Sequence, residues 1–461
     1  MPTSAHWIFL IFVVIIILTL IFRKPPILPA AIGLFGVGIA DSGDVIGAIQ
    51  VSFRALSLAT GNLLTVILLI GIVVALTRLL KETEADQVMI KPLLRIRTLG
   101  VAYWAIGIGM WILTLLVWPT PAISLLGAVA VPALVKVGIN PIGLAVSLTI
   151  FGEGIGLAGD FVIQGAPSLL SKAAGIPVHT IISASFPVVM LSGLFAAVAG
   201  WVTLAFLLKK EEAQHVLFEE KELNRDVKKV TIEKSPLKPE RIRMIASCVV
   251  IGYLITVIFI LTLKIRGDGA SALIGGVTLF ILCLCTLLKD GKGAFSSFMD
   301  YIKEGLRFAM GVFAPIVIMS SFFFLGTKSG YQQILHHEGL GFFSDFAYSL
   351  SGWIPLSKWT VGILIVLVAI LGSMDGSGFS SLPLVGGISV ALSQAAGLDA
   401  VPLAVLGQVA GIWTGAALIP WGFTAVTAAV AGVDVHQLVK YTLPAYFAAV
   451  ITAFLWTMLI L

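Results

Sequence analysis

Two hydrophobic runs of this chain are separated by the polar, glycine-rich segment Leu371-Gly-Ser-Met-Asp-Gly-Ser-Gly-Phe-Ser-Ser-Leu-Pro-Leu-Val-Gly-Gly387. In the hydrocarbon of a bilayer an unpaired backbone N–H or C=O costs several kcal/mol, so irregular backbone survives only inside the protein or beside a water-filled cavity. We therefore expect the segment to form the tip of a re-entrant helical hairpin. The second arm would then point the positive end of its helix dipole at the tip.

The residues of this tip are of the kinds that bind small ligands. Glycines adopt backbone dihedrals that other residues avoid, hydroxyl groups donate and accept hydrogen bonds, and a carboxylate binds a cation or a proton. The segment contains all three kinds, as Gly372, Gly376, Gly378, Ser377, Ser380, Ser381 and Asp375. We predict a binding site at this tip.

The composition indicates a membrane protein. Of the 461 residues, 58% are hydrophobic and 11% are charged, and the mean hydropathy is +1.06. Soluble domains are about half apolar and about a quarter charged. Hydrophobic runs of about 20 residues, enough to cross a bilayer core, recur without the alternation of barrel strands. We expect an all-α polytopic membrane protein, whose net charge of +5 reflects basic cytoplasmic loops and not nucleic-acid binding.

The two halves of the sequence repeat each other. At an offset of 257 residues, Ala174-Gly-Ile-Pro-Val-His179 and Pro187 correspond to Ala431-Gly-Val-Asp-Val-His436 and Pro444. At an offset of 259, Gly138, Leu144, Gly152 and Gly156 correspond to Gly397, Leu403, Gly411 and Gly415. The ordered set includes histidines at equivalent places in a chain that has only 6, so it indicates a duplication.

Each repeat is expected to contain five crossings, one re-entrant hairpin and one glycine-interrupted helix. The first repeat covers 1–208, with its hairpin at 101–137 and its broken helix at 141–170. The second covers 244–461, with its hairpin at 361–396 and its broken helix at 401–431. Because five crossings is an odd number, two successive repeats have opposite orientations, and the sequence predicts an inverted repeat.

Two amphipathic stretches, 44–60 and 294–309, are expected to lie along the membrane surface. Each would be followed by a separate apolar helix, at 63–80 and 312–325. The charged segment 209–243 is expected to be a cytoplasmic linker between the repeats. Most of the 29 Lys and Arg then fall on one side of the membrane, which the positive-inside rule makes cytoplasmic. We predict a multi-pass protein of the plasma (inner) membrane with both termini outside.

Three carboxylates lie within the predicted spans: Glu153, Asp160 and Asp375. A carboxylate at membrane depth is costly unless it is paired, hydrated or protonated, so we expect all three to serve the coupling ion, and Glu153 and Asp375 also the substrate. Glycines that unwind a helix expose carbonyl oxygens to Na⁺, although close helix packing explains them equally well. The candidate glycines are Gly156, Gly376, Gly411 and Gly415, and the candidate substrate-binding hydroxyls are Thr120, Ser124, Ser377, Ser380, Ser381 and Thr414.

No Lys or Arg lies at the middle of a predicted span. Arg is the usual bidentate partner of a carboxylate. An anionic substrate would therefore depend on helix N-termini, hydroxyls and a co-bound cation. A cationic substrate would need none of these groups, because it could bind the carboxylates directly.

This plan resembles that of the ion transporter superfamily of secondary carriers, whose members have two inverted repeats, each with a re-entrant hairpin and an interrupted helix. Members that carry dicarboxylates have a Ser-Asn-Thr signature at both hairpin tips. Here the tips read Ser377-Gly-Phe-Ser-Ser381 and Pro119-Thr-Pro-Ala-Ile-Ser124. The resemblance implies a transport domain that slides, elevator-like, against a scaffold through which a homodimer forms.

The leading interpretation is a secondary active transporter, coupled to H⁺ or Na⁺, that moves a small organic anion of the carboxylate type. The organic-anion substrate rests on the family resemblance. The alternative is a cation/proton antiporter of the Na⁺/H⁺ type, for which buried acids without buried bases are suited. A channel, which would share the re-entrant loops, and an intramembrane hydrolase using Ser377 and His436 are less favoured. The hydrolase is disfavoured because the tip lacks nucleophile-elbow spacing. We expect no enzymatic activity and no cofactor other than the coupling ion.

Overall fold

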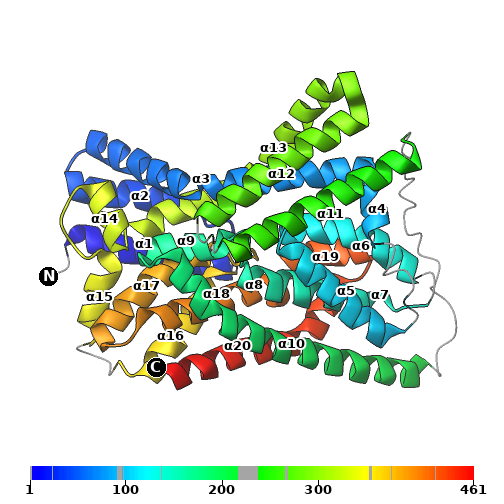
Figure 1. Ribbon diagram of the computed structural model, residues 1–461. Helices are drawn as coiled ribbons and strands as arrows, with labels where there is room; N and C mark the ends of the chain where they lie inside the picture. Colours follow the sequence, from blue (N-terminus) through cyan, green and yellow to red (C-terminus); the bar gives the residue numbers. More distant parts are fainter. Residues whose placement is uncertain are drawn as a thin grey trace.

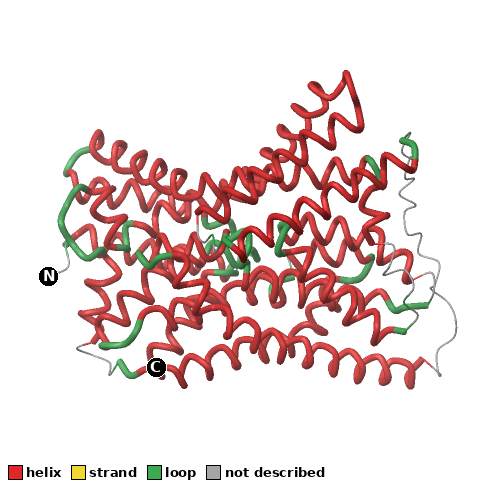
Figure 2. Tube along the Cα trace, in the orientation of Figure 1, coloured by secondary structure: helices red, strands yellow, loops and turns green. Residues whose placement is uncertain are grey.

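The computed structural model describes residues 3–22, 24–90, 96, 98–135, 138–215, 237–263, 265, 268–351, 356–374, 376–420 and 422–461. Within these ranges every regular element is a helix (Figures 1 and 2). Six helical stretches are long and apolar enough to cross a membrane, or seven if a bent helix near the N-terminus counts as one span. The predicted all-α polytopic membrane protein is confirmed. The ten crossings and their orientation stay predictions.

The helices of the first half follow one another with short connections. They are α1 (Ser4–Ile21), α2 (Ile27–Ser42), α3 (Val45–Glu82), α4 (Ala85–Ile90), α5 (Leu99–Thr114), α6 (Pro119–Val135), α7 (Pro141–Leu148), η2 (Thr149–Gly156), α8 (Leu157–Gly159), α9 (Gly165–Ala174) and α10 (Val178–His215). The helix pair α5–α6 lies where the sequence predicts the first hairpin. The re-entrant path of that hairpin stays a prediction.

The helices of the second half are again a mixture of long and short ones. They are α11 (Pro239–Thr262), α12 (Asp268–Asp290), η3 (Gly291–Gly293), α13 (Ala294–Phe324), α14 (Lys328–Leu335), α15 (Phe342–Ser351), α16 (Lys358–Gly372), α17 (Ser381–Ala396), α18 (Ala400–Trp413), η4 (Thr414–Leu418), α19 (Phe423–Ala431) and α20 (Val435–Ile460). The predicted second hairpin corresponds to α16–α17.

Local capping recurs at the offsets found in the sequence. Asn140 and Asp399 each accept a hydrogen bond from the backbone N–H two residues ahead and so begin α7 and α18. Gly175 and Gly432, which end α9 and α19, both have the left-handed backbone that favours glycine. A duplication predicts this correspondence. The division into repeats at 1–208 and 244–461 and their inverted relation stay predictions.

The predicted breaks after the amphipathic stretches are wrong. The first stretch continues into the following apolar run as α3, which bends by 45° between Thr65 and Ile67. The second continues as α13, a single helix of 31 residues. One glycine costs a helix interior only about 1 kcal/mol. The packing of α3 against α13 along their lengths offsets that cost.

The helices form two outer layers with the hairpins and broken helices between them. Figure 1 shows α3, α12 and α13 along the upper edge and the packed pair α10–α20 along the lower edge. The short helices α6, α8, α17, α18 and α19 lie between these layers. Both sets of broken helices therefore lie in the interior of the protein.

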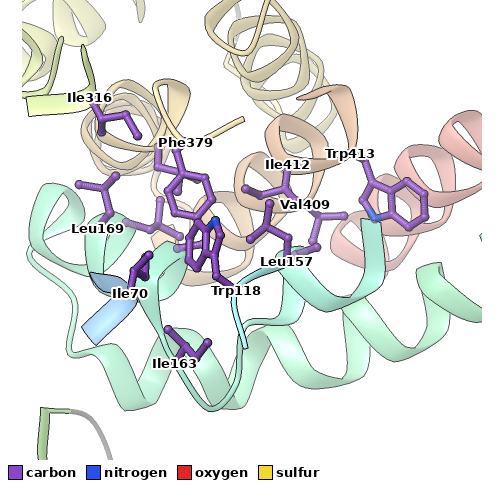
Figure 3. Close-up of a cluster of buried hydrophobic side chains, with 14 of the residues drawn as sticks. Ile70, Trp118, Leu157, Ile163, Leu169, Ile316, Phe379, Val409, Ile412 and Trp413 are labelled. Atoms are coloured by element: carbon purple, nitrogen blue, oxygen red, sulfur yellow. The ribbon is translucent and has the colours of Figure 1, made fainter. Parts of the chain in front are cut away.

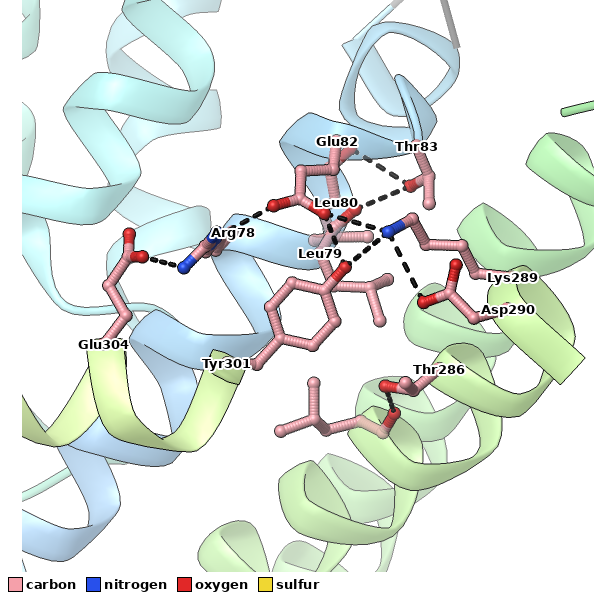
Figure 4. Close-up of polar contacts among 11 residues, drawn as sticks. Arg78, Leu79, Leu80, Glu82, Thr83, Thr286, Lys289, Asp290, Tyr301 and Glu304 are labelled. Atoms are coloured by element: carbon pink, nitrogen blue, oxygen red, sulfur yellow. Dashed lines mark hydrogen bonds and ion pairs between the residues drawn. The ribbon is translucent and has the colours of Figure 1, made fainter. Parts of the chain in front are cut away.

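A network of charged groups joins the end of α3 to α12 and α13 (Figure 4). Tyr301 donates its hydroxyl hydrogen to Glu82 over 2.6 Å, and Lys289 donates to Glu82 over 2.9 Å and to the Tyr301 hydroxyl over 2.7 Å. Arg78 pairs with Glu82 over 2.9 Å and also with Glu304. Charged partners in a network hold geometry better than an isolated surface pair. The network fixes one end of the α3–α13 contact.

Glycines bring the backbones of α3 and α13 into contact along the same surface. A Cβ atom at Gly305 would lie 2.0 Å from the carbonyl oxygen of Gly71. No side chain can give way there, because the obstacle is backbone. A Cβ atom at Gly311, on the same helix, would meet nothing within 4 Å.

We predict that Gly305→Ala lowers the thermal unfolding midpoint. The added methyl group overpacks the contact between α3 and α13, which costs about 1 to 3 kcal/mol of stability. Gly311→Ala is the matched control, and its midpoint should stay the same or rise, because alanine is the better helix former. The measurement is thermal unfolding of both variants in the same detergent. Equal midpoints for the two variants would show that the stability of the protein does not depend on the close contact between Gly305 and Gly71.

Candidate functional site

The glycine-rich parts of the two broken helices are helical and not unwound. Residues 149–156 form the wide π-helix η2, and 414–418 form the π-helix η4. The helix is interrupted after these segments, from Asp160 to Gln164 in the first half and at Ile419, Pro420 and Gly422 in the second. The expectation that these glycines themselves unwind the helix is therefore wrong. π-helical turns are rare and are frequent at functional sites.

The two broken helices cross where Gly154 meets Trp413. A Cβ atom at Gly154 would lie 2.6 to 2.8 Å from three atoms of the Trp413 indole ring, so only glycine admits this contact. Gly154 and Trp413 occupy corresponding positions at the offset of 259. Contact between two corresponding residues is what a two-fold relation between the halves produces. The two-fold relation itself stays a prediction.

Glu153 lies beside this crossing and is fully buried. Its Oε1 accepts a hydrogen bond from the hydroxyl of Thr427 on α19 over 3.1 Å, and its Oε2 has no hydrogen-bond partner. Thr149, four residues earlier on η2, is also fully buried, and its Oγ1 has no partner. Buried polar atoms are almost always hydrogen-bonded. A carboxylate oxygen and a hydroxyl without partners are the features expected of a site that takes a cation or a proton.

The broken helices also contribute apolar side chains to the buried core. Figure 3 shows part of this buried cluster, with Leu157 on α8, Val409 and Ile412 on α18, and Trp413 at the end of α18. The residues that correspond to Glu153 and Thr427 in the other half are Ile412 and Leu170. The polar pair thus exists on only one side of the crossing. In the described part of the chain no Lys or Arg is buried.

Asp160 has a different setting from Glu153. Its Oδ1 accepts from the backbone N–H of Gln164 over 3.0 Å and its Oδ2 from that of Ala166 over 2.9 Å. Its backbone is left-handed, with φ of +38°. Both carboxylate oxygens thus hold the start of α9, in the manner of a helix cap. Its predicted role with the coupling ion stays a prediction.

The serines of the second hairpin tip bond mainly to the tip itself. Ser380 donates to the carbonyl of Gly372 and Ser381 to that of Gly378, both over 2.9 Å. Ser373 donates to the hydroxyl of Ser381 over 2.9 Å. These bonds close the turn between α16 and α17. The hydroxyls that the sequence assigns to substrate here stabilise the tip in this conformation.

The candidate glycines allow close approach of the tip and the broken helices. A Cβ atom at Gly411 would lie 2.5 Å from the Ser381 hydroxyl, and one at Gly415 would lie 2.5 Å from the backbone nitrogen of Gly378. Gly376 has φ of +87°, and its carbonyl accepts from Phe423 N over 3.2 Å. Gly156 is crowded in the same way by Thr114 of α5. The sequence left two explanations for these glycines open, an ion site and close helix packing. The observed contacts support close helix packing.

The other sequence candidates are scattered. Thr414 donates its hydroxyl hydrogen to Ala410 O over 2.7 Å, and Ser377 Oγ accepts from Phe379 N over 3.2 Å. Thr120 is half-buried in the first turn of α6. Asp375 and the side chain of Ser124 lie outside the described residues.

Two site residues were missed by the sequence analysis. Thr149 was detectable, because it lies about one helical turn before Glu153. Thr427 was not detectable from the sequence, because it comes from the other half of the chain and only the fold brings it to Glu153. The candidate site therefore contains residues from both halves of the chain.

Comparison with known proteins identifies relatives. The family model described as "Na+/H+ antiporter family" matches residues 162–461. YhfA of Bacillus subtilis (strain 168), described as an uncharacterized membrane protein, is 32% identical over 442 residues, which are 94% of each chain.

Two solved structures share the fold. MtrF of Neisseria gonorrhoeae, reported with a class of antimetabolite efflux pumps, has a TM-score of 0.56 at 12% identity, covering 99% of this chain and 95% of that chain. The YdaH transporter of Alcanivorax borkumensis also has a TM-score of 0.56 at 12% identity, covering 99% and 98%. At this identity the similarity shows the fold alone.

These matches correct the family expected from the sequence. The resemblance to the ion transporter superfamily is wrong, because it rested on a plan of hairpins and broken helices that several groups of carriers use. The family model and the curated relative match the residues themselves over most of the chain. The chain belongs to the Na⁺/H⁺ antiporter family.

Proposed function

We propose that this protein exchanges a monovalent cation for protons across the plasma membrane and that Glu153 binds each in turn. The observation that carries the proposal is the buried Glu153 carboxylate, with one oxygen bonded to Thr427 and the other without a partner. The family match begins at residue 162, after Glu153. The role of Glu153 therefore rests on its surroundings, while the class of transport is supported by the family.

The chemistry of exchange follows from burial. An ionised carboxylate at membrane depth needs a positive partner, and no Lys or Arg is buried in the described residues to provide one. A bound cation or a proton can neutralise Glu153, and the protonated carboxyl no longer carries the charge that attracts the cation. The carboxylate thus binds the two in competition. Thr427 Oγ1 and Thr149 Oγ1 are the oxygens proposed to complete the cation's coordination.

Organic-anion import, the leading interpretation from sequence, has less support. Its predicted hydroxyls at Ser380 and Ser381 hold the hairpin tip together. A buried acid beside the crossing would also repel an anionic substrate. We therefore favour antiport over symport with a carboxylate. The homodimer and the orientation of the termini remain expectations.

Replacing Glu153 tests the proposal directly. In proteoliposomes with an imposed pH gradient, added Na⁺, Li⁺ or K⁺ should drive proton movement that a pH-sensitive dye reports. Glu153→Gln, which keeps the size and the hydrogen bond but cannot exchange a proton, should reduce this signal to that of empty liposomes. Glu240→Gln removes an exposed carboxylate and is the matched control, with wild-type exchange expected. Wild-type exchange in Glu153→Gln would refute the assignment.

Thr427 should set the affinity for the cation. Thr427→Val keeps the shape but removes the hydroxyl bonded to Glu153, so the cation concentration for half-maximal exchange should rise about tenfold, the equivalent of one charge-assisted hydrogen bond. Thr424→Val is the control on the same helix, because its hydroxyl donates to the carbonyl of Ile419 and not to Glu153. A similar loss of affinity in both variants would indicate a general disturbance of α19 and no ligand role for Thr427.

A further inference from the structure

Gln408 joins the two broken helices inside the protein. It lies on α18, is fully buried, and its amide Nε2 donates a hydrogen bond to the backbone carbonyl of Ala158 on α8 over 2.8 Å. The donor and the acceptor are 250 residues apart and come from opposite halves of the chain. Figure 3 shows their sequence neighbours, Leu157 and Val409, in the same buried cluster. We call this hydrogen bond the Gln408–Ala158 tie.

The acceptor is one of the last carbonyls of the first broken helix. Helix α8 directly continues η2 and ends just before Asp160, whose backbone is left-handed. The last four carbonyls of a helix have no partner within the helix. The backbone N–H of Asp160 bonds to the carbonyl of Gly156 over 2.8 Å, and Gln408 bonds to that of Ala158. The tie therefore satisfies a buried carbonyl at the end of the helix that carries Glu153.

Glutamine is a costly residue for this position unless its donor is needed. The Oε1 atom of Gln408 is buried and has no hydrogen-bond partner. Buried polar atoms are almost always paired, and leaving one unpaired lowers stability. A methionine would fill a similar volume without that cost. The donor at Nε2 is thus the property that sets glutamine apart here.

The donor is also neutral. Lys or Arg could bond to the same carbonyl but would place a positive charge beside the first broken helix. An ionised Glu153 would attract that charge, in competition with a transported cation. In the part of the chain that the structure describes, no Lys or Arg is buried. Gln408 therefore holds the end of the helix without supplying a counter-charge to Glu153.

The tie acts on Glu153 through the helix that carries both Glu153 and Ala158. The two residues are five positions apart, a little over one helical turn. A second contact between the same broken helices is that of Gly154 with Trp413. Two contacts along one helix fix its rotation as well as its position, and the rotation decides where the Glu153 carboxylate points.

We propose that Gln408 is a positioning residue for Glu153, which holds the first broken helix so that the carboxylate stays bonded to Thr427. The bond between Glu153 and Thr427 is 3.1 Å long, which is long for a hydroxyl donor, so a small rotation of η2 breaks it. The effect on transport rests on the proposed cation/proton exchange. The effect on the helix does not.

The first test measures how firmly the helix is held. Backbone hydrogen exchange over 149–159 is compared at mildly acid pH between wild type and Gln408→Met, which keeps the size and removes the donor. Loss of one buried hydrogen bond should speed this exchange about tenfold. Gln408→Glu should stay close to wild type, because a carboxyl buried without a positive partner keeps its proton and can donate it to the same carbonyl.

Gln164→Met is the matched control for both tests. Gln164 is also buried and also has an Oε1 without a partner, but its amide bonds to the carbonyl of Phe161, within its own half, over 3.3 Å. Its variant should therefore exchange like wild type over 149–159. Wild-type exchange in Gln408→Met, or an equal change in Gln164→Met, would overturn the proposal.

The second test measures cation/proton exchange in the same preparations. In Gln408→Met the cation concentration for half-maximal exchange should rise about tenfold, while the maximal rate should stay within about twofold of wild type. Gln164→Met should follow wild type in both quantities. Unchanged affinity in Gln408→Met beside an active wild type would overturn the positioning role. If wild type itself exchanges no cation, the proposed function fails, and hydrogen exchange alone decides whether Gln408 holds the helix.

Discussion

One buried carboxylate constrains the chemistry of the candidate site. Glu153 is placed at the crossing of two broken helices, with a threonine of the opposite half on one oxygen and nothing on the other. A charge in such a place is tolerated only if a cation or a proton accompanies it. Under the proposed function, that constraint makes a cation and a proton compete for the same carboxylate, which is the basis of antiport.

Glycine makes the crossing possible. Gly154 admits the Trp413 ring, while Gly411 and Gly415 admit the hairpin tip from the other side. Close contacts of small residues are how helices associate in membranes, where hydrophobicity supplies little attraction between them. The same contacts bring Thr427 and Glu153 together from two halves of the chain. The hairpin tip takes part in this packing, and its predicted binding role stays a prediction.

The sequence predicted the features that periodicity and composition control. The all-helical membrane fold follows from the hydrophobic runs, and the burial of Glu153 follows from its place inside one of them. The sequence could not predict that α3 and α13 are each one helix, because packing between two distant helices decides whether a glycine breaks a helix. Nor could it find Thr427, since only the fold brings α19 to η2. Asp160 was expected, like Glu153, to serve the coupling ion, and only the structure reveals its capping bonds to Gln164 and Ala166.

The central claim is that a cation and a proton compete for Glu153. The most direct measurement is proton release when Na⁺ or another monovalent cation is added to the purified wild-type protein in weakly buffered detergent solution. The account predicts that the cation that binds releases protons, with the same concentration dependence as binding itself. Saturable binding of the transported cation without any release of protons would contradict it.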